Sequence, residues 1–141
     1  MTVYEAGIMR NGVLLALRVY HHTSSVDQDL KSALFSALEM ATRDTFGDSL
    51  DIIQLKTISI VYAKSPKDEG KFVAYAVCDR KSDCKLIKEI LQNILESFLE
   101  EYSDNLDSPK REDYANFKEK MDEFFKDLSE TPDERARSLF G

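Results

Sequence analysis

The sequence predicts one α+β domain in three layers, with helices on both faces of a five-stranded, mostly antiparallel sheet. Two apolar segments near the start are separated by Asn11-Gly12, a dipeptide that tolerates the positive φ angles of a tight hairpin turn. Three later segments are rich in β-branched and aromatic residues, and three others repeat apolar residues at helical spacing. The predicted order is therefore strand, strand, helix, strand, strand, strand, helix, helix.

The five strands are expected over Val3–Met9, Val13–Tyr20, Leu50–Leu55, Thr57–Ala63 and Phe72–Cys78. The second of them carries apolar residues at both odd and even positions, so both of its faces should be covered. The simplest arrangement places the first helix on one face of the sheet and the last two helices on the other.

The first helix is predicted from Ser25, which stands three residues before Gln28 at the spacing of a capping box. Gly47 is placed to end this helix in a left-handed cap. One apolar stripe follows the helical period and is expected to pack on the sheet: Val26, Leu30, Ala33, Leu34, Ala37, Leu38 and Ala41. Phe35 and Met40 fall off this stripe.

The last two helices have their own stripes. Ser82 is a candidate N-cap for the longer one, whose inner face is Ile87, Ile90, Leu91, Ile94, Leu95, Phe98, Leu99 and Tyr102. Ser108-Pro109 supplies a cap and a first-turn proline for the final helix, whose inner face is Tyr114, Phe117, Met121, Phe124 and Leu128. We therefore expect a domain over residues 1–128 and a polar C-terminal tail over 129–141.

Composition narrows the function class. The formal net charge is −7 and no basic stripe is visible, which argues against binding to nucleic acid. No apolar run reaches the roughly 18 to 20 residues that cross a bilayer. The start of the chain lacks the pattern of a secretory signal, and Cys78 and Cys84 are expected to be reduced thiols. These features favour a cytoplasmic protein without a transmembrane segment.

The sequence offers no constellation for chemistry. His21 and His22 are adjacent on an extended segment, so their side chains point apart and cannot readily share a metal ion. The five glycines form no phosphate-binding loop. The charged bend at residues 79–83 is interpreted as a solvated turn before a helix. We therefore expect no catalytic residues, no metal site and no cofactor, and we expect that the protein is not an enzyme.

Several segments carry a family resemblance. They are Arg10-Asn11-Gly12 in the first turn, 33–38 in the first helix, and the central strand segments 57–62 and 72–77. Together with the segment order, they make residues 2–128 resemble a longin domain, of the stand-alone archaeal type and close to the roadblock class. The resemblance implies a strand order of 2-1-5-4-3, which makes Val13–Tyr20 and Leu50–Leu55 the edges of the sheet.

The same resemblance implies a non-enzymatic adaptor or scaffold that pairs with itself, or with a longin or roadblock partner, through the second strand and the first helix. It also implies that the domain binds or regulates a small GTPase or an assembly of the membrane-trafficking type, as in vesicle trafficking. The candidate interface residues are Leu14, Ala16, Arg18, Tyr20, Lys31, Phe35 and Glu39. For Phe35, two interpretations stay open: it fills a gap over the sheet, or it belongs to an exposed apolar patch.

Two other binding functions compete with the adaptor. A small-molecule sensor would use space that Ala74 and Ala76 leave between the sheet and a helix. A profilin-like protein that binds actin or phosphoinositides is disfavoured by the net acidity. Peripheral association with a membrane also stays open, because a local patch could dock although the molecule as a whole is acidic.

Overall fold

A computed structural model of the chain describes residues 2–10, 13–20, 28–48, 51–64, 72–102, 114 and 116–126, with the side chains of the first helix described from residue 33 onward. Several predictions lie outside these residues. They are the hairpin turn at Asn11-Gly12, the cap at Ser25, the histidine pair, the cap at Ser108-Pro109, and the tail over 129–141, together with the side chains of Val26, Leu30, Lys31 and Leu128.

The sheet has the order β2-β1-β5-β4-β3, and every neighbouring pair is antiparallel. Its strands are β1 (Val3–Arg10), β2 (Val13–Val19), β3 (Ile52–Gln54), β4 (Ile58–Lys64) and β5 (Phe72–Asp79). The predicted fold class and strand order are therefore confirmed, and β2 and β3 are the two edges.

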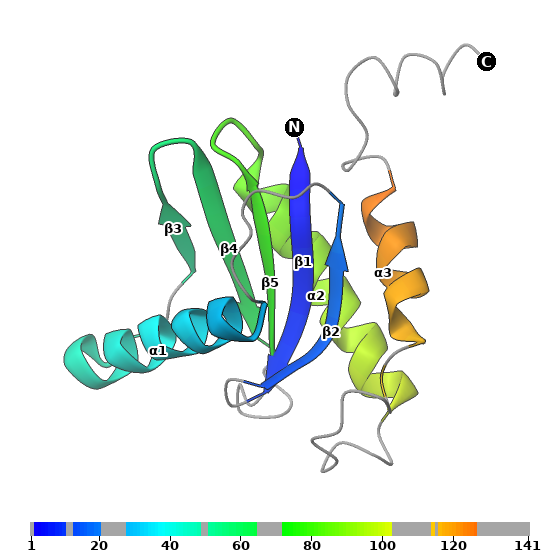
Figure 1. Cartoon of the computed structure of the whole chain (residues 1–141), viewed down its shortest axis with the longest axis horizontal. Helices are drawn as coiled ribbons and strands as arrows, with labels where there is room; N and C mark the ends of the chain where they lie inside the picture. Colours follow the sequence, from blue (N-terminus) through cyan, green and yellow to red (C-terminus); the bar gives the residue numbers. More distant parts are fainter. Residues whose placement is uncertain are drawn as a thin grey trace.

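The helices form the outer layers. The first helix, α1 (Gln28–Phe46), lies across one face of the sheet, and α2 (Cys84–Glu101) and α3 (Phe117–Phe125) cover the other (Figure 1). Each face has its own core. No described helix is long and apolar enough to cross a lipid bilayer.

The larger core lies beneath α2 and α3. Ala74 and Ala76 on β5 are fully buried there, together with the inward residues of both helices. The ring of Phe98 is its centre, with Phe72, Tyr102, Tyr114 and Phe117 all within 5.8 Å between ring centroids. The alanines thus give close packing of helix on sheet, and the space that the sensor hypothesis assigned to a ligand is part of this packed core.

The smaller core lies beneath α1 and contains two tyrosines. The Tyr75 ring lies over Gly7 on the neighbouring strand. A Cβ atom at position 7 would stand 2.6 Å from a carbon of that ring, so only glycine fits there. The Tyr75 hydroxyl donates a hydrogen bond to the carboxylate of the buried Glu5 at 3.0 Å. Tyr62 lies next to Tyr75 on the neighbouring strand. This face is therefore more polar inside than the opposite one.

The helix ends follow local chemistry. Gly47 has a φ of 66°, and its N–H donates to the Arg43 carbonyl at 2.8 Å, which confirms the predicted left-handed cap. The prediction of Ser82 as the cap of α2 is wrong. Asp83 caps the helix by accepting from the Leu86 N–H, because the Ser82 hydroxyl donates instead to the carboxylate of Asp79. On α3, Phe117 and Met121 are buried as predicted. Phe125 is also fully buried, whereas Phe124 packs against the core only partly buried.

Candidate protein-binding surface

The strand β2 does not present the apolar surface that the sequence suggested. Leu14 and Ala16 are only 2% and 1% exposed. Leu14 packs in the core beneath α1, and Ala16 packs in the core beneath α2 and α3. Both predicted interface side chains are therefore buried within the subunit, because both faces of β2 are covered.

Two other predicted residues of β2 and its end are engaged with α3. The Arg18 guanidinium donates from Nε to Oδ1 of Asp122 at 2.9 Å, and its Nη2 lies 2.8 Å from Oδ2 of the same carboxylate. The Tyr20 ring meets the Phe125 ring edge-on, with 6.2 Å between centroids. Burial and the neighbouring Asp122 raise the pKa of the Tyr20 hydroxyl. These contacts occupy Arg18 and Tyr20 inside the subunit.

Phe35 is the side chain that seats α1 on the sheet. It is buried, and its ring makes edge contacts with Tyr75 at 5.0 Å and with Tyr62 at 6.3 Å between centroids. Burial raises the pKa of both tyrosine hydroxyls. Of the two interpretations of Phe35, the structure supports the one in which the ring fills a gap over the sheet.

Glu39 stands one turn after Phe35 and is 5% exposed. Its carboxylate forms an ion pair with Lys64 at the end of β4 and accepts from Arg43 at 3.3 Å. Burial lowers the pKa of Lys64. Buried carboxylates need such partners, because an unpaired charge away from water is costly. Glu39 therefore joins α1 to β4 within the subunit and is not exposed on the surface.

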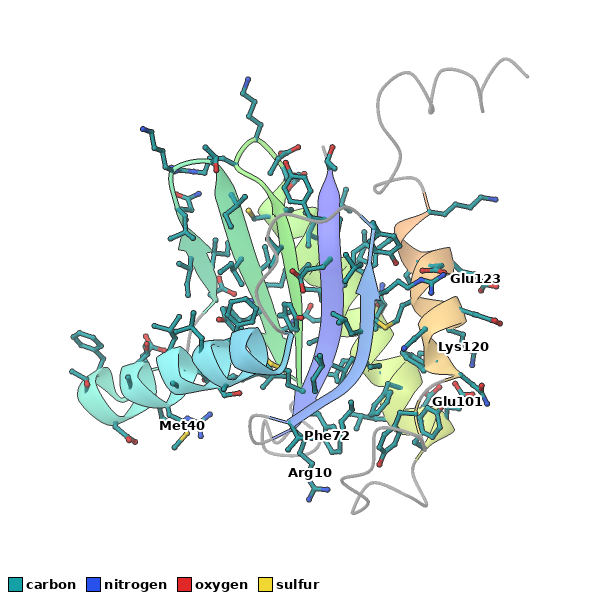
Figure 2. The ribbon with its side chains drawn as sticks, in the orientation of Figure 1. Arg10, Met40, Phe72, Glu101, Lys120 and Glu123 are labelled. Carbon is teal, nitrogen blue, oxygen red and sulfur yellow. The ribbon has the colours of Figure 1, made fainter. Side chains whose placement is uncertain are left out.

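The apolar stripe of α1 faces solvent, contrary to the prediction that it packs on the sheet. Its described members are all exposed: Ala33, Leu34, Ala37, Leu38 and Ala41. The physical reason is helical geometry. Phe35 and Glu39 turn toward the sheet, and at about 100° per residue the positions on either side rotate away from it. Met40 and Phe46 extend the exposed apolar surface toward the end of the helix, where Met40 points away from the sheet (Figure 2).

The edge strand β3 is short and open. The Tyr62 N–H donates to the Asp51 carbonyl at 2.9 Å, and the Leu55 N–H donates to the Ile58 carbonyl at 2.8 Å. In an antiparallel ladder the alternate residues point their backbone groups the other way, so Ile52 and Gln54 direct theirs toward the open edge. Ile52 and Leu55 also expose apolar side chains.

Two basic residues hold β3 in place from within the subunit. Arg80 donates to the Leu55 carbonyl at 2.7 Å and to the Gln54 side chain at 3.1 Å. Lys88 of α2 forms an ion pair with Asp51. The edge is thus a fixed strand, and Figure 1 shows α1 running across the sheet toward the same side. We call Leu34 and Leu38 of α1, together with the outward backbone groups of Ile52 and Gln54 on β3, the α1–β3 surface. The Ile52 side chain stands opposite Val61 and therefore points to the α2 face of the sheet.

The described residues hold no cluster of metal-ligating side chains. No three His, Cys, Asp or Glu side chains among them gather around a point where a metal ion could sit. Burial raises the pKa of the Cys78 thiol to about 12, which leaves it protonated and a poor nucleophile.

The fold resembles that of a solved Roadblock/LC7 domain from Streptomyces avermitilis. The two share 15% sequence identity with a TM-score of 0.52, over 73% of this chain and 87% of that domain. No family model matches the sequence, and no curated protein matches it. The likeness therefore establishes a roadblock- and longin-like fold.

Proposed function

We propose that the protein is a non-enzymatic adaptor that self-associates through the α1–β3 surface. The observation that carries the proposal is the exposure of Leu34 and Leu38 on a helix whose other face is already seated on the sheet. Exposed apolar patches on a folded domain commonly mark surfaces for other proteins. The roadblock- and longin-like fold supports this function by analogy.

A second copy fits this surface better than it fits β2. The edge of β3 offers outward backbone groups at Ile52 and Gln54, which can pair with the same groups of another copy about a two-fold axis. On α1, alanines at positions 33, 37 and 41 alternate with the leucines and allow two helices to approach closely. Stable interfaces bury roughly 1,200 Å² or more, so a pair would have to bury both features together.

The wider role that we propose is scaffolding in the cytoplasm. The resemblance to longin and roadblock domains suggests a small GTPase, or an assembly of the membrane-trafficking type, as the protein bound by the pair. A heterodimer with another longin or roadblock chain is the alternative form of the same proposal. Binding of purified small GTPases in both nucleotide states, measured by calorimetry, tests this partner class, and the absence of heat with every GTPase would count against it.

The self-association is tested by light scattering coupled to size exclusion. We expect wild type to have the mass of two chains at tens of micromolar, and Leu38→Asp to have the mass of one, because a carboxylate would be buried without a partner. Leu86→Asp is the matched control: Leu86 on α2 is 38% exposed and Leu38 is 37% exposed. The proposal fails if wild type is monomeric throughout, or if both substitutions act alike.

A further inference from the structure

The helix α3 lies along the edge of the sheet opposite to β3. Phe117, Met121 and Phe125 are fully buried in the main core, and Figure 1 shows the helix outboard of β2. The Arg18–Asp122 fork and the Tyr20–Phe125 ring contact join the helix to that strand. Residues far apart in the sequence are thereby fastened at one edge.

The ladder shows which groups of β2 point toward this edge. The Tyr20 N–H donates to the Tyr4 carbonyl at 2.8 Å, and Arg18 stands opposite Ala6 two residues earlier. Because hydrogen-bonded pairs alternate along an antiparallel ladder, Leu17 and Val19 direct their N–H and C=O groups away from β1. These are the groups that an additional strand would need.

An additional strand would collide with α3. It would lie about 4.8 Å beyond β2 and project alternate side chains toward each face of the sheet. On the α2 side, that space is taken by α3, whose diameter with side chains is about 10 Å.

We propose that α3 closes the β2 edge, so that self-association is confined to the β3 side and ends at two copies. The inference rests on the proposed function for the side that associates. A sheet with both edges open can add a copy at each and grow without limit, whereas one closed edge leaves a single isologous contact that closes on itself. On this view α3 is the element that limits the size of the assembly.

The test loosens α3 in the full chain. Asp122→Arg replaces the fork with repulsion from Arg18, and Asp122→Arg/Phe125→Ala also removes the ring contact with Tyr20. We expect the Leu17 and Val19 amides to exchange with solvent faster, by about fivefold in the single variant, the factor that an exposed ion pair provides. We also expect masses above that of wild type, increasing with concentration, with the larger effect in the double variant.

Two control variants distinguish the contact between α3 and β2 from the other contacts of α3. Arg18→Asp/Asp122→Arg restores an ion pair and should return both exchange and mass to the wild-type values. Lys120→Glu removes the pair between Lys120 and Glu101, 3.0 Å apart on the side toward the end of α2, and should leave both unchanged (Figure 2).

The proposal is overturned if the two amides exchange faster but the mass does not exceed that of wild type. It is also overturned if exchange is unchanged in the double variant, because α3 would then not shield the edge. Should the double variant lose its circular dichroism signal, the single variant decides, since Asp122 is partly exposed. A monomeric wild type would overturn the proposed function and the limit at two copies. Closure of the β2 edge by α3 would still be decided by the amide exchange and by growth beyond the wild-type mass.

Discussion

The two faces of the sheet are covered in different ways. The helix α2 buries the stripe that its sequence displays, including Ile87, Leu91 and Phe98. The helix α1 turns a phenylalanine and a glutamate toward the sheet and leaves its alanine and leucine stripe outside. An apolar stripe therefore does not by itself identify the face of a helix that packs on the sheet. For α1 we propose that a second copy covers the stripe.

The largest expected loss of stability comes from a substitution in the core beneath α2 and α3. Phe98→Ala removes the ring at the centre of the aromatic cluster and should lower the free energy of unfolding by about 4 kcal/mol. Phe35→Ala should cost about 1 kcal/mol less, because fewer groups surround that ring beneath α1. Urea denaturation followed by circular dichroism measures both. Equal losses would contradict the claim that the two faces differ in packing.

The next largest loss of stability should come from the Glu39–Lys64 ion pair, which joins α1 to β4. Glu39→Ala leaves Lys64 partly buried without its partner and should lower the free energy of unfolding by about 2 kcal/mol. Arg43→Ala is the matched comparison on the same carboxylate. Its side chain is more than half exposed, so we expect a loss of about 0.5 kcal/mol or less. If the two variants were equally stable in urea, Glu39 would not be the link between α1 and β4.

The smallest effect at neutral pH concerns Tyr62, whose buried hydroxyl has no hydrogen-bond partner among the described residues. Tyr62→Phe should change the free energy of unfolding at pH 7 by less than about 1 kcal/mol. Its effect should appear in alkali.

Burial raises the pKa of Tyr62 in the folded state above its unfolded value near 10. The folded state therefore holds the proton longer, and the stability that this hydroxyl contributes is complete below pH 10 and is lost as pH rises above it. Denaturation between pH 9 and 11 should show a shallower fall for Tyr62→Phe than for wild type. Parallel curves would show that the hydroxyl does not remain buried and protonated.

Much of the fold could be predicted from the sequence because it depends on local signals. The α2 stripe follows from periodicity and the Gly47 cap from the conformation that glycine allows, whereas the strand order was implied by the resemblance to longin domains. The cap of α2 could not be assigned, because Ser82 and Asp83 are both capable and the choice depends on the hydrogen bond between Ser82 and Asp79.

The candidate site was harder to predict because it depends on how α1 is rotated about its own axis and on contacts between residues that are far apart in the sequence. Leu34 and Leu38 were assigned to the core, since hydropathy favours their burial over that of Glu39; the pairing of Glu39 with Lys64, 25 positions later, reverses this. The β2 edge could not be excluded as the interface from the sequence, because no local pattern indicates that Arg18 pairs with Asp122 of α3. The resemblance implied that Leu50–Leu55 is the other edge, but no local signal in the sequence favoured that edge over β2.

The brevity of β3 limits how many hydrogen bonds the proposed pair of subunits can form. The strand has three residues, and only Ile52 and Gln54 turn their backbone groups outward, so a second strand can gain only a few hydrogen bonds there. Most of the attraction must then come from the helix leucines, which impose little directional constraint. We therefore expect the proposed pair to dissociate and re-form readily, and to exchange one copy for a different partner as their relative amounts change.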